Sequence, residues 1–122
     1  MTMYTDRLLS YWHSNKSGWR FNHYTHTASL QHSDFEACHD EVEFRVKLND
    51  TLAVVNFWAR GCAVAECATA MLAELATGKP LAWLDTFTDE DWIAYVNAPL
   101  TPFKRQCALL PLQCLRKAVS NG

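Results

Sequence analysis

The sequence predicts an α+β fold in which a three-stranded antiparallel sheet carries helices on one face. Residues 41–48, EVEFRVKL, alternate apolar and charged side chains, as in a strand with one buried face and one wet face. After Asn49 and Asp50, which favour a turn, residues 52–59 return as a second and more apolar strand. Residues 58–80 then place apolar residues at helical spacing and end in Gly78 and Pro80, which predicts a helix packed against that hairpin.

The rest of the chain fits the order helix, three strands, then helices. We expect a short amphipathic helix over residues 4–12, a first strand over residues 19–30 and a loop over residues 31–37. Thr88, followed by three acidic residues, is typical of a capped helix start.

The last helix is expected to begin near Cys107, after an extended linker bracketed by Pro99 and Pro102. This start follows from Pro111, because proline is well tolerated only in the first turn of a helix.

Size and composition bound the class of protein. The 122 residues suffice for one domain, which we place at residues 1–122. A net charge of −2 with scattered basic residues gives no nucleic-acid footprint, and no apolar run is long enough to span a membrane. The N-terminus lacks the layout of a signal peptide, and the chain has five cysteines, an odd number, so we expect a reducing, cytoplasmic location.

Three of the cysteines stand at junctions between predicted elements: Cys38, Cys62 and Cys107. A helix N-terminus, where Cys62 stands, favours the thiolate, which is both nucleophile and metal ligand. Asp40 shares a side with Cys38 in an extended segment. Together with Cys38, Cys62 and Cys107, it would form a ligand set for tetrahedral zinc or a small iron–sulfur cluster. No CxxC pair is present, so buried structural thiols are the alternative, and this is the favoured interpretation of Cys67 and Cys114.

The chain resembles the NifU/IscU-type iron–sulfur cluster assembly scaffolds, including the SufU branch, over nearly its whole length. The matching segments are residues 4–9 (YTDRLL), 37–40 (ACHD), 61–65 (GCAVA) with 77–79 (TGK), and 100–110 (LTPFKRQCALL).

This resemblance implies a carrier that performs no turnover alone. Cys38, Cys62 and Cys107 would hold a nascent 2Fe–2S cluster, with Asp40 as an oxygen neighbour. Any of the three cysteines could accept sulfur from a cysteine desulfurase, and the cluster would pass to apo client proteins. A chaperone would recognise the segment that contains Leu100, Pro102 and Lys104.

Two of the departures from the family pattern lie next to the candidate ligands. Gln106 replaces the histidine before the last cysteine, and His39 replaces the glycine between Cys38 and Asp40. Both residues are candidates for secondary metal contacts. The departures leave two alternatives open: a zinc-binding sulfur acceptor that stimulates a cysteine desulfurase, as in the SufU branch, and a degenerate member with a structural or regulatory role.

Overall fold

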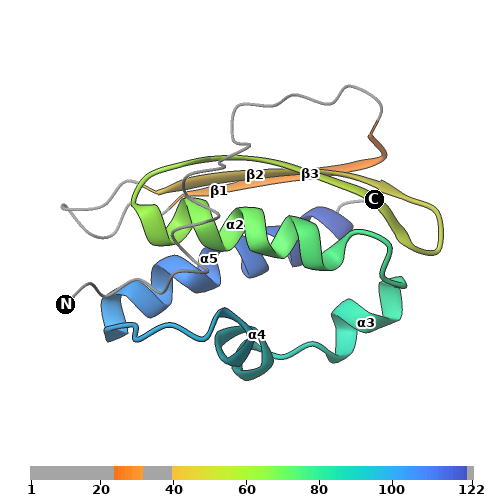
Figure 1. Cartoon of the computed structure of the whole chain (residues 1–122). Coiled ribbons are helices and arrows are strands. Elements are labelled where there is room, and N and C mark those ends of the chain that lie inside the picture. Colours follow the sequence, from red (N-terminus) through yellow and green to blue (C-terminus); the bar gives the residue numbers. More distant parts are fainter. Residues whose placement is uncertain (1–23, 32–39, 121–122) are drawn as a thin grey trace.

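A computed structural model describes residues 24–31 and 40–120 of the chain. Its sheet contains β1 (His26–Gln31), β2 (Glu41–Leu48) and β3 (Leu52–Arg60). The strands pair antiparallel in the order β1-β2-β3, so β2 is central (Figure 1). This α+β architecture confirms the fold class that the sequence predicts.

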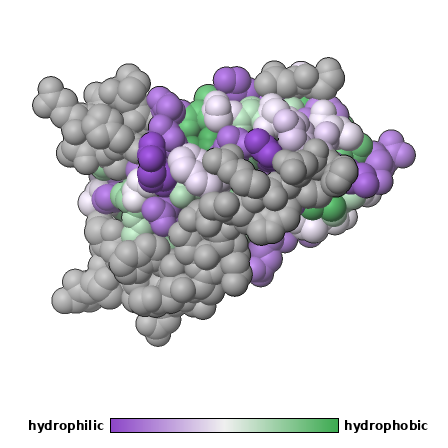
Figure 2. All heavy atoms as spheres, turned by 90° about the horizontal axis from the view of Figure 1, so that it is seen from above, coloured by the Kyte–Doolittle hydropathy of each residue, from purple (hydrophilic) through white to green (hydrophobic). Residues whose placement is uncertain are grey.

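The alternation along β2 separates the two faces of the sheet. Val42, Phe44 and Val46 are buried on the face toward the helices, where they form the core with residues of α2 and α5. The charged residues of β2 face the other side, where hydrophilic side chains are visible among paler ones (Figure 2). The predicted strand 41–48 is therefore confirmed with its bounds unchanged.

The other two strands differ from their predicted ranges at the ends. Asp50 closes the β2–β3 hairpin with a φ of 76°, and β3 runs one residue further than predicted, to Arg60. The strand β1 begins at His26 and continues through Gln31, a residue that the sequence assigned to a loop. The helix predicted over residues 4–12 and the first part of the predicted strand 19–30 lie outside the described residues.

Two long helices cover the inner face of the sheet: α2 (Ala63–Ala76) and α5 (Pro102–Ser120). The shorter helices α3 (Leu81–Thr86) and α4 (Asp89–Val96) lie on the far side of this helical layer from the sheet (Figure 1). Gly78, with a φ of 87°, follows the end of α2 as the sequence predicts, whereas α3 was not predicted. None of the helices in the described ranges is both long and apolar enough to cross a membrane.

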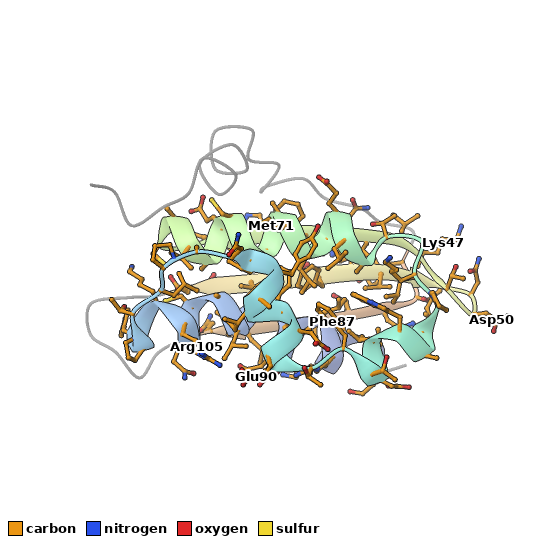
Figure 3. The ribbon with its side chains drawn as sticks, turned by 60° about the horizontal axis from the view of Figure 1, so that its bottom comes forward. Lys47, Asp50, Met71, Phe87, Glu90 and Arg105 are labelled. Carbon is orange, nitrogen blue, oxygen red and sulfur yellow. The ribbon has the colours of Figure 1, made fainter. Side chains whose placement is uncertain are left out.

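Side-chain hydrogen bonds and an ion pair stabilise the start of α4 and join this helix to α5. Thr88 and Asp91 form a complete capping box at the start of α4, which confirms the predicted cap. The buried Trp92 donates its indole hydrogen to the carbonyl of Ala108 at 2.7 Å. Glu90 pairs with Arg105 across the two helices at 3.2 Å (Figure 3).

The predicted start of the last helix is wrong. The helix α5 begins at Pro102 and not near Cys107, so the linker after α4 is shorter and Pro111 lies inside the helix. Pro102 occupies the first helical position, where its missing amide hydrogen costs nothing. Pro111 is buried in the core, and this tertiary packing outweighs the helix bond that proline cannot make to the carbonyl of Cys107.

We predict that Phe44→Ala lowers the free energy of unfolding by about 3–5 kcal/mol, because Phe44 is fully buried at the centre of the core. Urea denaturation of the purified chain measures this loss. The matched control is Lys47→Ala, an exposed residue of the same strand, for which a change within about 0.5 kcal/mol is expected. Equal losses in the two variants would contradict the assignment of the buried face.

Candidate metal centre

Asp40 is a buried carboxylate that stands directly before β2. The residue is 0% exposed, and its Oδ1 accepts a hydrogen bond of 2.9 Å from the backbone N–H of Cys62. A buried carboxylate is costly unless it is hydrogen-bonded or bound to a cation. The bond from Cys62 meets part of this requirement and fixes Asp40 beside the start of α2.

Gly61 makes this close approach feasible. Its φ is +147°, and a Cβ at this position would lie 2.8 Å from the Cα of Asp40 and closer still to Oδ1. Any larger residue would therefore push against the carboxylate and its backbone, in a conformation that side chains rarely adopt. Gly61 thus serves both the turn between β3 and α2 and the position of Asp40.

Cys62 is the N-cap residue of α2, and its Sγ lies 3.7 Å from Oδ2 of Asp40. The pKa of Cys62 is lowered to about 6, mainly because the Cys107 thiol donates a hydrogen bond to its sulfur. The backbone N–H of Ala65 and the charge of Lys104 act in the same direction, while burial and Asp40 act against them. Cys62 is consequently the more acidic of the two thiols, and its thiolate is favoured, as expected for a cysteine at a helix N-terminus.

Cys107 is the opposite member of the pair. It lies in the second turn of α5, is 0% exposed, and donates a hydrogen bond to the Cys62 sulfur. This hydrogen bond, burial and the neighbouring Asp40 all hold the pKa of Cys107 above its ordinary range. In the metal-free protein the negative charge therefore rests on Cys62 and the proton on Cys107.

The three side chains form a compact group of metal-ligand atoms. One carboxylate oxygen of Asp40 and the sulfurs of Cys62 and Cys107 all lie within 4.8 Å of one another. Ligands of one tetrahedral ion lie about 3.3–3.8 Å apart, as follows from metal–ligand bonds of about 2.0–2.3 Å. A small inward movement would thus let the group bind a single cation.

The remaining predicted site residues are distributed differently. Cys38 and His39 lie outside the described residues. Gln106 is exposed on α5, directly before the buried Cys107. Its role as a secondary metal contact stays a prediction.

The predicted partner-binding residues lie at the start of α5. Leu100 packs against the core, Pro102 is exposed, and Lys104 is half-buried. Sequence reasoning assigned Lys104 only to a partner surface and missed its effect on the Cys62 thiolate. It also missed that Gly61 makes room for Asp40. The signal in the sequence was the turn at Arg60 and Gly61, between the predicted strand and the predicted helix.

The two cysteines expected in the core are confirmed there. Cys67 and Cys114 are buried, and burial raises the pKa of each thiol to about 12. The Cys114 thiol donates to the carbonyl oxygens of Ala28 and Val42, at 3.4 and 3.5 Å. Neither thiol belongs to the ligand group.

Comparison with known proteins defines the class to which this fold and site belong. The family model of the NifU-like N-terminal domain matches residues 3–121. The chain therefore belongs to the NifU-like N-terminal domain family, the iron–sulfur cluster assembly scaffold family that its cysteine motifs resemble.

Individual relatives agree with this assignment. The iron–sulfur cluster assembly scaffold protein IscU of Aquifex aeolicus (strain VF5) is 32% identical over 88 residues, 70% of this chain. The chain spans about half of that relative, 55% of its length.

Two solved structures share the fold across nearly the whole chain. A protein of Fervidobacterium islandicum AW-1, described as an iron–sulfur cluster assembly scaffold for the SUF system, has a TM-score of 0.75 at 20% identity. The match covers 96% of each chain. The N-terminal part of a NifU-like protein of Brucella abortus has a TM-score of 0.67 at 16% identity, covering 98% of this chain and 96% of that one.

We predict that Gly61→Ala abolishes tight binding of Co²⁺, used as a coloured substitute for Zn²⁺, because the new Cβ displaces Asp40. Absorption of the Co²⁺–thiolate complex during titration measures this loss. The matched control is Gly78→Ala, where φ is also positive but a Cβ meets nothing within 4 Å. That variant should lose about 1 kcal/mol of stability through backbone strain and still bind Co²⁺ normally. Equal metal binding by both variants would contradict the role of Gly61.

We predict that Cys62 reacts with iodoacetamide in the folded, metal-free protein much faster than Cys67 or Cys114. Its lowered pKa of about 6 means that its thiolate is present above that pH and is lost below it, so its rate should rise through pH 6 and level off by neutral pH. Peptide mass spectrometry at a series of pH values measures the rate at each cysteine.

The variant Cys107→Ala tests the cause of this acidity. Removing the hydrogen-bond donor should move the Cys62 profile toward higher pH, whereas Cys114→Ala should leave it in place. A Cys62 profile that is centred above pH 8 in the unaltered protein, or is unchanged in Cys107→Ala, would refute the assignment.

Proposed function

We propose that residues 1–122 act as one iron–sulfur cluster assembly scaffold domain in the cytoplasm. The domain would accept sulfur from a cysteine desulfurase, combine it with iron, hold a transient 2Fe–2S cluster and pass it to apo client proteins. The observation that carries this proposal is the convergence of Asp40, Cys62 and Cys107 in a chain of this family. Cys38, two residues before Asp40, would supply the third thiolate.

Sulfur acceptance would follow from the different protonation of Cys62 and Cys107, the two described thiols of the ligand group. The Cys62 thiolate attacks the terminal sulfur of the desulfurase persulfide, forming a new S–S bond at Cys62. The S–S bond in the desulfurase breaks, and the desulfurase cysteine leaves as a thiolate, so this transfer itself needs no oxidant or reductant. The later conversion of the bound sulfur to the sulfide of a cluster takes two electrons per sulfur from an external electron donor. The low pKa of Cys62 supports its choice as the first acceptor among the described cysteines.

The mixed donor set suits a cluster that must also leave. Thiolates bind iron strongly, whereas a carboxylate is a harder and weaker partner for a cluster iron. Oδ1 of Asp40 is bonded to the Cys62 amide, which leaves Oδ2 as the oxygen that faces the Cys62 sulfur. Asp40 would therefore be the ligand that is exchanged first when a client approaches.

The start of α5 would serve a partner chaperone. Leu100, Pro102 and Lys104 form the segment, and Lys104 also favours the thiolate at Cys62. A chaperone bound to this segment would thus act on the electrostatics of the site as well as on the position of Cys107.

A zinc-bound sulfur acceptor that stimulates a cysteine desulfurase is the second candidate. The observation that favours it is the compactness of the ligand group, since three atoms within 4.8 Å fit one tetrahedral ion. With Cys38 the ligands would be three cysteines and one aspartate, and a bound zinc would hold the thiols until the persulfide arrives.

For the scaffold, we predict that anaerobic incubation with iron, cysteine, a cysteine desulfurase and dithiothreitol, which reduces the persulfide sulfur to sulfide, yields a brown protein with the absorption and Mössbauer spectra of a 2Fe–2S cluster. Cys38→Ala, Cys62→Ala and Cys107→Ala should each lose this cluster. The matched control is Cys67→Ala, which removes a buried thiol of α2, the helix that follows Cys62, and this thiol lies outside the ligand group.

Metal analysis of the purified protein separates the candidates. One tightly bound zinc per chain, with faster sulfur release by the desulfurase and no cluster on reconstitution, would favour the second candidate. Intact cluster spectra in Cys38→Ala and Cys107→Ala would refute the scaffold site. Uptake of neither zinc nor iron would indicate a degenerate member with a structural or regulatory role.

A further inference from the structure

A groove lies between α3, the start of α4 and the C-terminal end of α5. Its volume is about 620 Å³, within the range of about 300–1,000 Å³ that is common for binding pockets. Leu81, Leu84, Phe87 and Val119 supply its apolar surface, and polar residues of the three helices complete its wall. Figure 3 shows Phe87 between α3 and α4, on the side of the helical layer that faces away from the sheet.

The segment that contains α3 and α4 carries charge of one sign. Residues 80–103 contain four acidic residues and no lysine, arginine or histidine. Asp89 pairs with Arg116 at 2.7 Å, Glu90 pairs with Arg105, and Asp91 belongs to the capping box of α4. Local structure therefore accounts for three of the four acids.

Asp85 is the acid that local structure does not explain. It is exposed in the last turn of α3, where the helix dipole makes a negative charge unfavourable. Within the described ranges, Asp85 has neither a hydrogen bond nor an ion pair. Its carboxylate lines the groove and is available to a cation that enters from outside.

Among the residues that the structure describes, Arg116 is the one base that lines the groove, and it is already paired. Arg116 donates from Nη1 to Oδ1 of Asp89 and from Nη2 to the carbonyl of Phe87, at 2.7 and 2.8 Å. The neighbouring Lys117 and Lys79 do not line the groove. With Asp85 and Asp89 against Arg116, the groove has an apolar floor and a net negative wall.

The groove is separate from the candidate metal centre. Both involve α5, but Arg116 stands nine residues after Cys107, or roughly 14 Å along the helix axis. A molecule in the groove would leave the ligand group accessible.

We propose that this groove docks a short segment of a partner protein that carries apolar side chains beside a lysine or arginine. The apolar side chains would lie between Leu84 and Val119, and the base would pair with Asp85. Charge complementarity selects this occupant, because nucleic acids and anionic membranes would be repelled by the same carboxylates. This surface is additional to the proposed scaffold activity and does not depend on it.

The test uses the full chain and three fluorescent peptides of equal length: one of leucine and lysine, one of leucine and glutamate, and one of serine and lysine. We expect only the leucine–lysine peptide to bind, as measured by fluorescence anisotropy. Backbone amide chemical-shift changes on binding should centre on residues of α3, the start of α4 and the end of α5.

Two variants and one control locate the binding. Asp85→Lys and Val119→Ser should each weaken binding of the leucine–lysine peptide by about tenfold or more. The control Glu74→Lys makes the same charge change at an exposed position of α2 outside the groove, and it should change the affinity by less than about twofold. Circular dichroism verifies that all three variants fold.

Several outcomes overturn the proposal. They are no binding of the leucine–lysine peptide at millimolar concentration, equal binding of either other peptide, and equal effects of Asp85→Lys and Glu74→Lys. Binding of the protein to phosphatidylglycerol vesicles that is lost in Val119→Ser would assign the groove to a membrane surface instead. Cluster assembly is measured separately, so failure here leaves the scaffold proposal unaffected.

Discussion

One hydrogen bond joins the sheet to the helical layer at the candidate metal centre. The Cys62 amide donates to Asp40 and thereby ties the start of β2 to the start of α2. The bond requires a glycine at position 61, because the carboxylate occupies the space of a side chain there. It also provides a partner for a carboxylate that the fold has removed from water, and it orients the second oxygen toward the Cys62 sulfur. The geometry of the site thus follows from the way two elements of the fold are joined.

The two thiols of the site differ in chemistry mainly because the Cys107 thiol donates a hydrogen bond to Cys62, and their positions relative to helices act in the same direction. Cys62 stands at the N-terminus of α2, where backbone N–H groups favour its negative charge. Cys107 stands inside α5 and is fully buried, which favours the protonated form. A metal that binds both must displace the proton from Cys107, so metal binding releases a proton and strengthens as pH rises. A single sequence therefore provides one thiol ready to react and one that becomes a ligand only when a cation is present.

The sequence was most informative where local rules and packing agree. The strand 41–48, the glycine after α2 and the cap at Thr88 follow from alternation, backbone conformation and capping, and all three are present. The predicted start of α5 was wrong. Pro111 lies inside the helix, where core packing outweighs the local rule that confines proline to the first turn. The distance between Cys107 and Cys62 could not be predicted from spacing, since it depends on how α5 packs under the sheet. The family resemblance predicted that these cysteines share a site, and its matching segments include Gly61, but it did not show that Gly61 makes room for Asp40 or that Cys107 lowers the pKa of Cys62.

The described ligands come from three segments that are far apart in the chain: the start of β2, the start of α2 and the second turn of α5. An unfolded chain does not hold such atoms together, so a bound cation stabilises only the folded state. At a free cation concentration of 100 times its dissociation constant, this linkage adds about 2.7 kcal/mol to the free energy of unfolding. If the group binds a cation, binding and folding form one coupled equilibrium, in which the metal-free protein is the less stable form. Thermal stability would then report the fraction of the protein that holds a cation.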